Sequence, residues 1–192
     1  MDFTKLQMKS LTNNNSIQIS TKLVQLVTSS LYIVTGILLF FASSQIRIES
    51  YPVPFTLQTF AVIAIGLLYP HKLGIYTILC TYLLTSLGLP LCAGYASGVA
   101  PFFGPGGGYL LGFYSCVWFL HMVEPLRRQQ AYSVWLLQVL CAQLIIWLSG
   151  YFGLLNFMDM TQAFWQGVFP FMITDMIKAI AAVFVVRALL IR

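Results

Sequence analysis

Charged residues are scarce in this sequence, and their scarcity excludes whole classes of protein. Of 192 residues, 8% are Asp, Glu, Lys or Arg and 59% are hydrophobic, whereas an average soluble domain carries about 25% charged residues. The composition therefore predicts an integral membrane protein. The net charge of +5 does not indicate nucleic-acid binding, because the basic residues form no stripe and the apolar runs leave no soluble face for phosphates.

Motifs of catalysis and metal binding are also missing. No His-Glu-x-x-His, Gly-x-Ser-x-Gly or phosphate-binding Gly-Lys-Ser/Thr motif occurs, so we expect neither an enzyme nor an ATPase. Any pumping energy must then come from a partner or an ion gradient. The cysteines form no Cys-x-x-Cys pair or Cys/His cluster, so we expect no metal or cofactor. They lie far apart, at Cys80, Cys92, Cys116 and Cys141.

Long apolar runs predict the fold. About 20 apolar residues suffice for a helix to cross a bilayer, and six runs approach that length, at 23–43, 55–69, 73–87, 109–123, 131–149 and 165–186. We expect an all-α integral membrane bundle of six transmembrane helices with ordered Gly/Pro-rich outer loops. Residues 1–21 are expected to form a polar cytoplasmic tail without a removable signal peptide. Residues 22–192 are expected to form a single transmembrane domain.

The basic residues predict the orientation of this bundle. With six spans, eight of them fall on one side, and Arg47 alone falls on the other. Because lysine and arginine are enriched in cytoplasmic loops, we expect a multi-pass protein of the cell (inner) membrane with both termini in the cytoplasm. The eight residues are Lys5, Lys9, Lys22, Lys72, Arg127, Arg128, Arg187 and Arg192.

Two loops on the outer side have unusual compositions. Pro52 and Pro54 prevent an ordinary helix and hold residues 44–54 on a rigid, strand-like path. Residues 88–108 contain seven glycines and three prolines but no charge. Non-helical backbone at membrane depth is tolerated where it is buried in protein or lines a cavity. We expect this segment to be a lid or wall over a pocket, the alternative being a tightly packed re-entrant segment.

The last apolar run contains two opposite charges, Asp175 and Lys178. Three residues apart on a helix, they share a face and lie within reach of one another. Each costs about 2.5–3.5 kcal/mol at the bilayer centre on insertion scales, so we expect them to pair, to bind something, or both. Asp175 lies about 15 Å into the sixth span at 1.5 Å per residue, which predicts the floor of a pocket reached from outside.

The pair also restricts the ligand. A carboxylate accepts hydrogen bonds and an ammonium donates them, so the pair suits a small molecule with both N–H donors and a carbonyl or carboxylate. Aromatic residues are expected to wall the apolar body of such a ligand; they are Phe55, Phe102, Phe103, Tyr109 and Phe171. A structural role, in which the ion pair only fixes helix packing, remains the alternative.

Four segments resemble one known family. They are Tyr-Pro-Val-Pro-Phe-Thr-Leu-Gln-Thr-Phe at 51–60, Leu-Gly-Leu-Pro at 87–90, Gly-Pro-Gly-Gly-Gly-Tyr-Leu-Leu-Gly-Phe at 104–113, and Asp-Met-Ile-Lys at 175–178. Together, in this order and spacing, they resemble the BioY family, the biotin-specific substrate-binding subunits of energy-coupling-factor (ECF) transporters. The resemblance spans residues 20–190.

The resemblance implies a six-helix bundle that captures biotin near the outer face. It implies that Asp175 accepts a hydrogen bond from a ureido N–H and that Lys178 donates to the ureido oxygen or to the valerate carboxylate. Tyr109, at the mouth of the pocket, and Gln58 are further expected ligand contacts. We add Phe55, at the start of the second span, and Tyr95, in the Gly/Pro-rich loop. Whether the chain works alone, as a homo-oligomer, or with an ECF transmembrane coupling subunit and two ATPase subunits stays open.

The sequence departs from the family pattern at three places. Gly106 stands where threonine is usual, and Tyr95 stands where glycine is usual, so a bulky side chain enters the loop expected over the ligand. The Ala-x-x-x-Ala docking motif that relatives often carry is missing from residues 23–43, where Thr28, Ser29 and Gly36 form the nearest small-residue surface. The alternatives are a binding subunit of the same architecture for another small vitamin and a membrane packing protein without a transport role.

Overall fold

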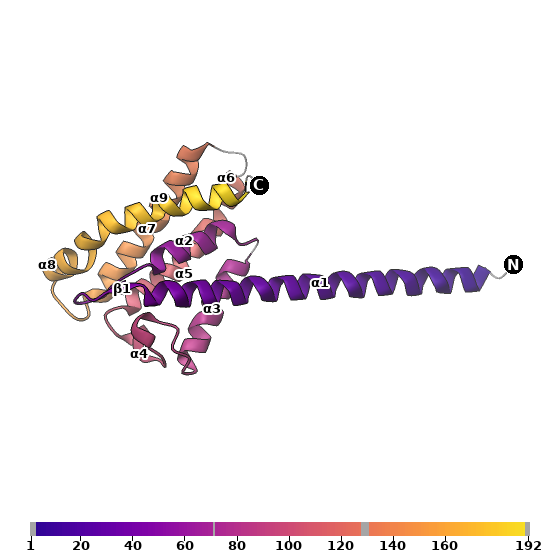
Figure 1. Ribbon diagram of the computed structural model, residues 1–192, viewed down its shortest axis with the longest axis horizontal. Coiled ribbons are helices and arrows are strands. Elements are labelled where there is room, and N and C mark those ends of the chain that lie inside the picture. Colours follow the sequence, from indigo (N-terminus) through magenta and orange to yellow (C-terminus); the bar gives the residue numbers. More distant parts are fainter. Residues whose placement is uncertain (1–2, 71, 128–130, 191–192) are drawn as a thin grey trace.

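The computed structural model describes residues 3–70, 72–127 and 131–190, and helices dominate it (Figure 1). The first helix, α1 (Phe3–Gln45), has 43 residues, and its part Ser20–Gln45 is long and apolar enough to cross a membrane. No proline or glycine precedes Gly36, so the sequence contains no helix breaker between the polar and apolar parts. The residues expected to form a polar tail therefore continue α1 away from the bundle (Figure 1).

A short antiparallel hairpin follows α1. Its strands are β1 (Arg47–Ile48) and β2 (Phe55–Thr56), with Arg47 opposite Thr56. The Leu57 N–H donates to the carbonyls of Ser43 (3.2 Å) and Ile46 (3.1 Å), which ties the hairpin to the end of α1. The hairpin brings β2 to the start of the next helix.

The next three predicted spans are shorter helices. They are α2 (Gln58–Leu68), α3 (Leu73–Ser86) and α5 (Gly107–Met122), with 11, 14 and 16 residues. At 1.5 Å per residue they measure about 17, 21 and 24 Å, against a hydrocarbon core of about 30 Å. Among the described residues, three helices are long and apolar enough to cross a membrane: Ser20–Gln45, Tyr132–Leu154 and Met160–Leu190.

The helices α5 and α7 (Tyr132–Leu154) approach each other through glycines. A Cβ atom on Gly108 would lie 2.5 Å from the carbonyl oxygen of Ser149 and 2.9 Å from the Cα of Gly153. One on Gly112 would lie 2.9 Å from the Cα of Ile146. Small residues allow such close backbone packing in membranes, and a larger side chain at either glycine would push the two helices apart.

The last helical stretch begins earlier than predicted. It comprises α8 (Met160–Gln162), the π-helical turn η2 (Ala163–Val168) and α9 (Phe169–Leu190). Asp159 caps its start, because its side chain accepts a hydrogen bond of 2.9 Å from the Gln162 N–H. Between α5 and α7 lies a short helix, α6 (Glu124–Arg127). In Figure 1, α9 runs beside α2 and α7.

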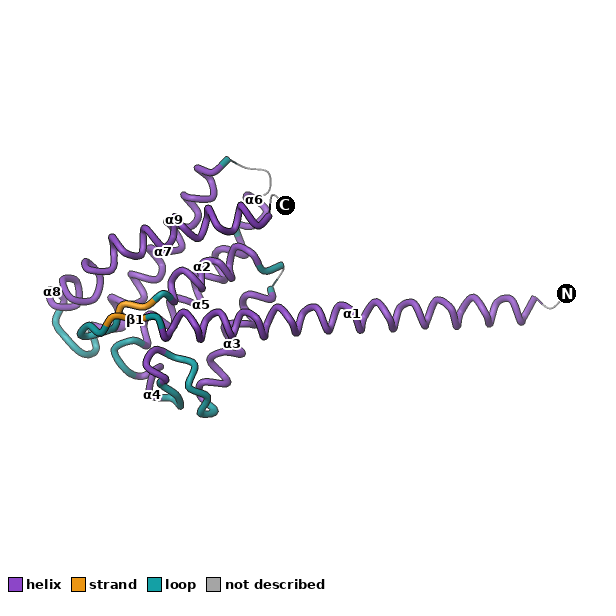
Figure 2. The backbone as a smooth tube through the Cα atoms, viewed as in Figure 1, coloured by secondary structure: helices purple, strands orange, loops and turns teal. Residues whose placement is uncertain are grey.

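The Gly/Pro-rich segment 88–108 folds against the bundle at the end that carries the hairpin (Figure 2). It contains the turn η1 (Ala93–Tyr95) and the short helix α4 (Ala100–Phe103). Side chains at the end of α1 hold it: Ser44 donates to the carbonyl of Leu91 (3.0 Å), and Gln45 donates to that of Cys92 (3.1 Å). The Cys92 side chain is buried there, and burial raises the pKa of its thiol.

Candidate functional site

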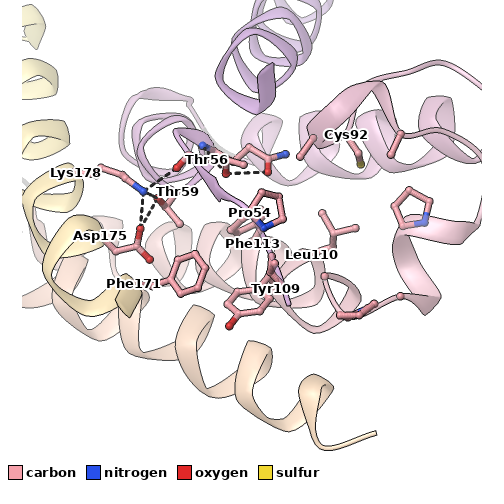
Figure 3. Close-up of a pocket in the computed structure, with 18 residues that line it drawn as sticks. Pro54, Thr56, Thr59, Cys92, Tyr109, Leu110, Phe113, Phe171, Asp175 and Lys178 are labelled. Carbon is pink, nitrogen blue, oxygen red and sulfur yellow. Dashed lines mark hydrogen bonds and ion pairs between the residues drawn. The ribbon is translucent and has the colours of Figure 1, made fainter. Parts of the chain in front are cut away.

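A cavity of about 230 Å³ lies between the Gly/Pro-rich segment and the helices. One wall comes from residues 92–106, which confirms that this segment lines a pocket. Another comes from the hairpin and the first turn of α2, and the rest from α5 and α9. Apolar side chains dominate the α5 wall, which includes Tyr109, Leu110 and Phe113. Figure 3 shows them facing the polar cluster formed by Asp175, Lys178, Thr56 and Thr59.

Asp175 lies at the polar end of this cavity and is 2% exposed. Its Oδ1 atom accepts hydrogen bonds from Lys178 Nζ (2.8 Å) and Thr59 Oγ1 (3.0 Å). Its Oδ2 atom accepts from Gln143 Nε2 (3.2 Å) and Trp147 Nε1 (3.1 Å). A carboxylate has about four lone-pair sites, so four donors from three helices offset the cost of burying this charge.

Lys178 is held in place by the residues around it. Its ammonium donates to the Thr56 carbonyl (2.7 Å) and to Asp175 (2.8 Å), and it lies 3.4 Å from Thr59 Oγ1 (Figure 3). The side chain is 16% exposed, against 3% for that of Asp175. Because the contact with Thr59 is long and an ammonium has three donors, one N–H of Lys178 has weak protein contacts and can serve a ligand.

Gln58 supplies a second available donor. The residue is 6% exposed and lines the cavity. Its Oε1 atom accepts from the Thr56 hydroxyl (3.1 Å), while its Nε2 atom is buried and has no hydrogen-bond partner among the described residues. A buried amide N–H without a partner costs about 1–3 kcal/mol, so this group is suited to an acceptor that enters the cavity.

The aromatic wall is fixed by its own contacts. Tyr109 is buried, and its hydroxyl donates to the carbonyl of Gly167 in the π-helical turn. Phe171 lines the cavity one turn before Asp175 and stacks on Phe55 with a centroid distance of 4.2 Å. The ring of Phe171 thus stands between Phe55 and the space that a ligand would occupy.

Of the predicted site residues, the structure brings Asp175, Lys178, Tyr109 and Gln58 to one cavity and leaves others outside its lining. Phe55 lies behind Phe171. Tyr95 is 63% exposed with a positive φ of 59°, and its ring packs near Phe41 rather than over the cavity.

Two aromatic residues predicted as walls are also outside the lining. Phe102 packs edge-on against Tyr82, and Phe103 is 80% exposed. Both belong to α4, whose short helix turns them away from the cavity while Pro101 faces it. Composition alone did not indicate which side of this segment points inward.

Gln143 and Trp147 are among the residues that sequence reasoning missed. They lie four residues apart on α7 and share a face. A usable signal existed, because Gln143 is a polar side chain inside an otherwise apolar run, and such residues usually face the interior of a bundle. Their partner on another helix could not be read from the sequence.

Comparisons with known proteins identify the family of this chain. The family model described as the BioY family matches residues 11–192. A probable biotin transporter BioY of Pyrococcus horikoshii is 38% identical over 146 residues, which cover 76% of this chain and 86% of the relative. The biotin transporter BioY of Thermotoga maritima is 32% identical over 133 residues, which cover 68% and 77%.

A solved structure shares the architecture. The S-component for biotin from an ECF-type ABC transporter superposes with a TM-score of 0.70 at 26% identity, covering 90% of this chain and 94% of that chain. The family model covers nearly the whole sequence, and the solved structure shares the helical fold. The chain belongs to the BioY family.

Proposed function

We propose that this chain is a biotin-binding subunit that captures biotin from the outer face of the membrane and mediates its uptake. Its membership in a family of biotin transporters supports this function. The observation that carries the proposal is the buried pair of Asp175 and Lys178 at the polar end of a cavity whose other walls are mainly apolar.

The chemistry of the cavity matches the two ends of biotin. The ureido ring offers two N–H donors and one carbonyl acceptor, and the Asp175 carboxylate can accept from the former. Lys178 and Gln58 can donate to the carbonyl, or to the valerate carboxylate. Among the described lining residues, Asp175 and Lys178 are the charged ones, so the pair is neutral overall. Burial of a neutral ureido group there costs less than burial of a second carboxylate.

The proposed topology has six transmembrane spans with both termini in the cytoplasm. The short helices α2, α3 and α5 cross with the help of the ordered segments at their ends. Lys22 lies in the middle of α1, Lys72 directly precedes α3, and Arg187 lies in the last turn of α9. In this topology all three are near the cytoplasmic side. Arg128 and Arg192, which also support this orientation, lie outside the described residues. The cavity then opens toward the outside.

The proposed energy source is a partner. The sequence contains no phosphate-binding motif, and the structural relative is a component of an ECF-type ABC transporter. We infer assembly with an ECF transmembrane coupling subunit and two ATPase subunits; a homo-oligomer acting alone is the competing assembly. In either case this chain supplies the binding site and no catalytic residue.

Equilibrium binding of tritiated biotin to the purified protein in detergent tests the function. We expect saturable binding, which excess unlabelled biotin abolishes and which excess thiamine or riboflavin leaves unchanged. Competition by another vitamin with little effect of biotin would assign the chain to that vitamin instead. Absence of saturable binding by folded protein would contradict the proposal.

A further inference from the structure

The two oxygens of the Asp175 carboxylate face different parts of the molecule. Oδ1 accepts from Thr59 and Lys178, which both line the cavity. Oδ2 accepts from Gln143 and Trp147, which both come from α7 and lie outside the lining. One oxygen is therefore on the cavity side, and the other is bound to a neighbouring helix.

The two donors on Oδ2 are suited to hydrogen bonds that persist when a ligand binds. An indole N–H can only donate, so Trp147 has a single way to bind the carboxylate. Gln143 is fully buried, and its Oε1 atom has no partner among the described residues. Its amide is thus turned so that the N–H group, and not the oxygen, meets Asp175. Hydrogen bonds to a charged acceptor are about twice as strong as neutral ones.

The donors on Oδ1 are easier to exchange. The Thr59 hydroxyl can rotate toward another acceptor, and Lys178 keeps the Thr56 carbonyl as a second partner. A ligand N–H that enters the cavity can therefore replace the hydrogen bond from Thr59 without disturbing Oδ2.

We propose that Gln143 and Trp147 are positioning residues, which anchor Oδ2 of Asp175 and thereby hold Oδ1 toward the cavity to accept a ureido N–H. This inference rests on the proposed biotin function and adds to it a set of residues that never touch the ligand. Their contribution to affinity acts through the orientation of one carboxylate.

The test compares two substitutions with two matched controls on the same helix. Trp147→Phe and Gln143→Leu remove the donors to Oδ2, whereas Trp135→Phe and Gln138→Leu change buried residues of the same types, which lie outside the lining of the cavity. Binding is measured for biotin and for the two biotins that carry a methyl group on one ureido nitrogen. Thermal unfolding in detergent confirms that each variant is folded.

We expect Trp147→Phe and Gln143→Leu to weaken biotin binding at least about tenfold, as loss of a hydrogen bond to a charged group does. The controls should bind biotin like the wild type. One of the methylated biotins lacks the N–H that donates to Asp175, so we expect the wild type to bind it weakly. The two substitutions should then weaken its binding little further. This dependence of one loss on the other is the coupling that a double-mutant cycle detects. Equal losses for all three ligands would indicate a general structural defect and overturn the inference.

A spectroscopic measurement covers the case in which a variant is too unstable to assay. In a protein whose other three tryptophans are replaced by phenylalanine, ultraviolet resonance Raman reports the hydrogen bond of the Trp147 N–H. We expect that bond to persist when biotin binds, and its loss would show that Oδ2 is the oxygen that meets the ligand. If the wild type binds biotin and both substituted proteins bind it equally tightly, the inference alone is refuted. If the wild type itself does not bind biotin, the proposed function is refuted.

Discussion

At the scale of single residues, the polar end of the cavity is organised by Thr56. Its carbonyl accepts from Lys178 and its hydroxyl donates to Gln58, so one residue of the hairpin fixes both side chains that retain a donor for a ligand. Gln58 Nε2 is buried without a partner among the described residues. Such a group destabilises the protein without ligand, and a hydrogen bond to a ligand acceptor removes that cost. Stability and binding should therefore respond to Gln58 in opposite directions.

The substitution Gln58→Leu tests this opposition. We expect a melting temperature that is unchanged or raised, because a buried N–H without a partner is removed, and biotin binding that is about threefold to tenfold weaker, as loss of one neutral hydrogen bond predicts. Differential scanning fluorimetry and equilibrium binding provide the two numbers. Gln138→Leu is the matched control, since its Oε1 atom is also buried without a partner but lies away from the cavity. A loss of both stability and affinity would argue for a purely structural Gln58.

Two of the three departures from the family pattern, Gly106 and Tyr95, are single-residue features. A Cβ on Gly106 would meet nothing within 4 Å, so there is room for the usual threonine. Tyr95 adopts a positive φ of 59°, a conformation that glycine adopts at no steric cost, so the backbone there suits glycine.

Tyr95→Gly should leave biotin affinity within about twofold of the wild type. The reason is that the Tyr95 ring is mostly exposed and contacts Phe41 rather than the cavity, and surface substitutions usually change free energies by less than about 0.5 kcal/mol. A biotin titration of the variant checks this. A strong loss of affinity would indicate that Tyr95 contributes to biotin binding.

At the scale of elements, the packing of α5 on α7 positions residues of the site. α5 carries Tyr109 and α7 carries Gln143 and Trp147, so the distance between the two helices sets how the aromatic wall and the donors to Asp175 are placed. Gly108 keeps that distance short.

We expect Gly108→Val to destabilise the protein by about 1–3 kcal/mol, as overpacking of a close contact does. The new Cβ would lie 2.5 Å from the carbonyl oxygen of Ser149, which is backbone and cannot turn away. Thermal unfolding in detergent measures the effect, with Gly106→Ala as a control on the same segment. Equal stability of the Gly108 and Gly106 variants would show that the helices tolerate wider spacing.

The Gly/Pro-rich segment can be tested through Cys92. This thiol is buried and lines the cavity, and its burial raises its pKa. The thiolate is the reactive form, so a raised pKa keeps the thiol protonated and unreactive at neutral pH. Its reactivity should rise as the pH approaches the raised pKa.

In a variant with Cys92 as the only cysteine, we expect slow alkylation by iodoacetamide that accelerates with pH and that biotin slows further. A variant with only Cys141, which lies outside the lining, should show no biotin effect. Fast reaction of Cys92, with or without biotin, would contradict a segment that covers the cavity.

At the scale of the whole molecule, the sequence predicted the architecture better than the details of the site. Apolar runs are required by the hydrocarbon interior of the membrane, so they located every major helix. The continuation of α1 to Phe3 was missed because its polar part is rich in asparagine, serine and threonine, which have a lower helix propensity than alanine or leucine. No proline or glycine ends the helix there. The partners of Asp175 were missed because contacts between distant segments depend on tertiary packing. Gln143 is 32 residues away in sequence, and Thr59 is 116 away.

The proposed partnership makes a prediction for cells. In a biotin-auxotrophic host, we expect coexpression of an ECF coupling module to raise the rate of tritiated-biotin uptake several-fold over this chain alone. The sequence contains no phosphate-binding motif, so we expect any ATP-driven uptake to depend on that module. Equal rates with and without the module would favour the homo-oligomer acting alone.

The account depends most on the claim that a buried pair of opposite charges holds biotin. The most direct measurement is the dissociation constant of tritiated biotin for the purified wild type and for Asp175→Asn, which keeps the size of the side chain and removes its charge. We predict at least about a hundredfold weaker binding by the variant, because Lys178 loses its charged partner and the ligand loses a charged acceptor. A folded Asp175→Asn protein that binds biotin as tightly as the wild type would contradict the claim.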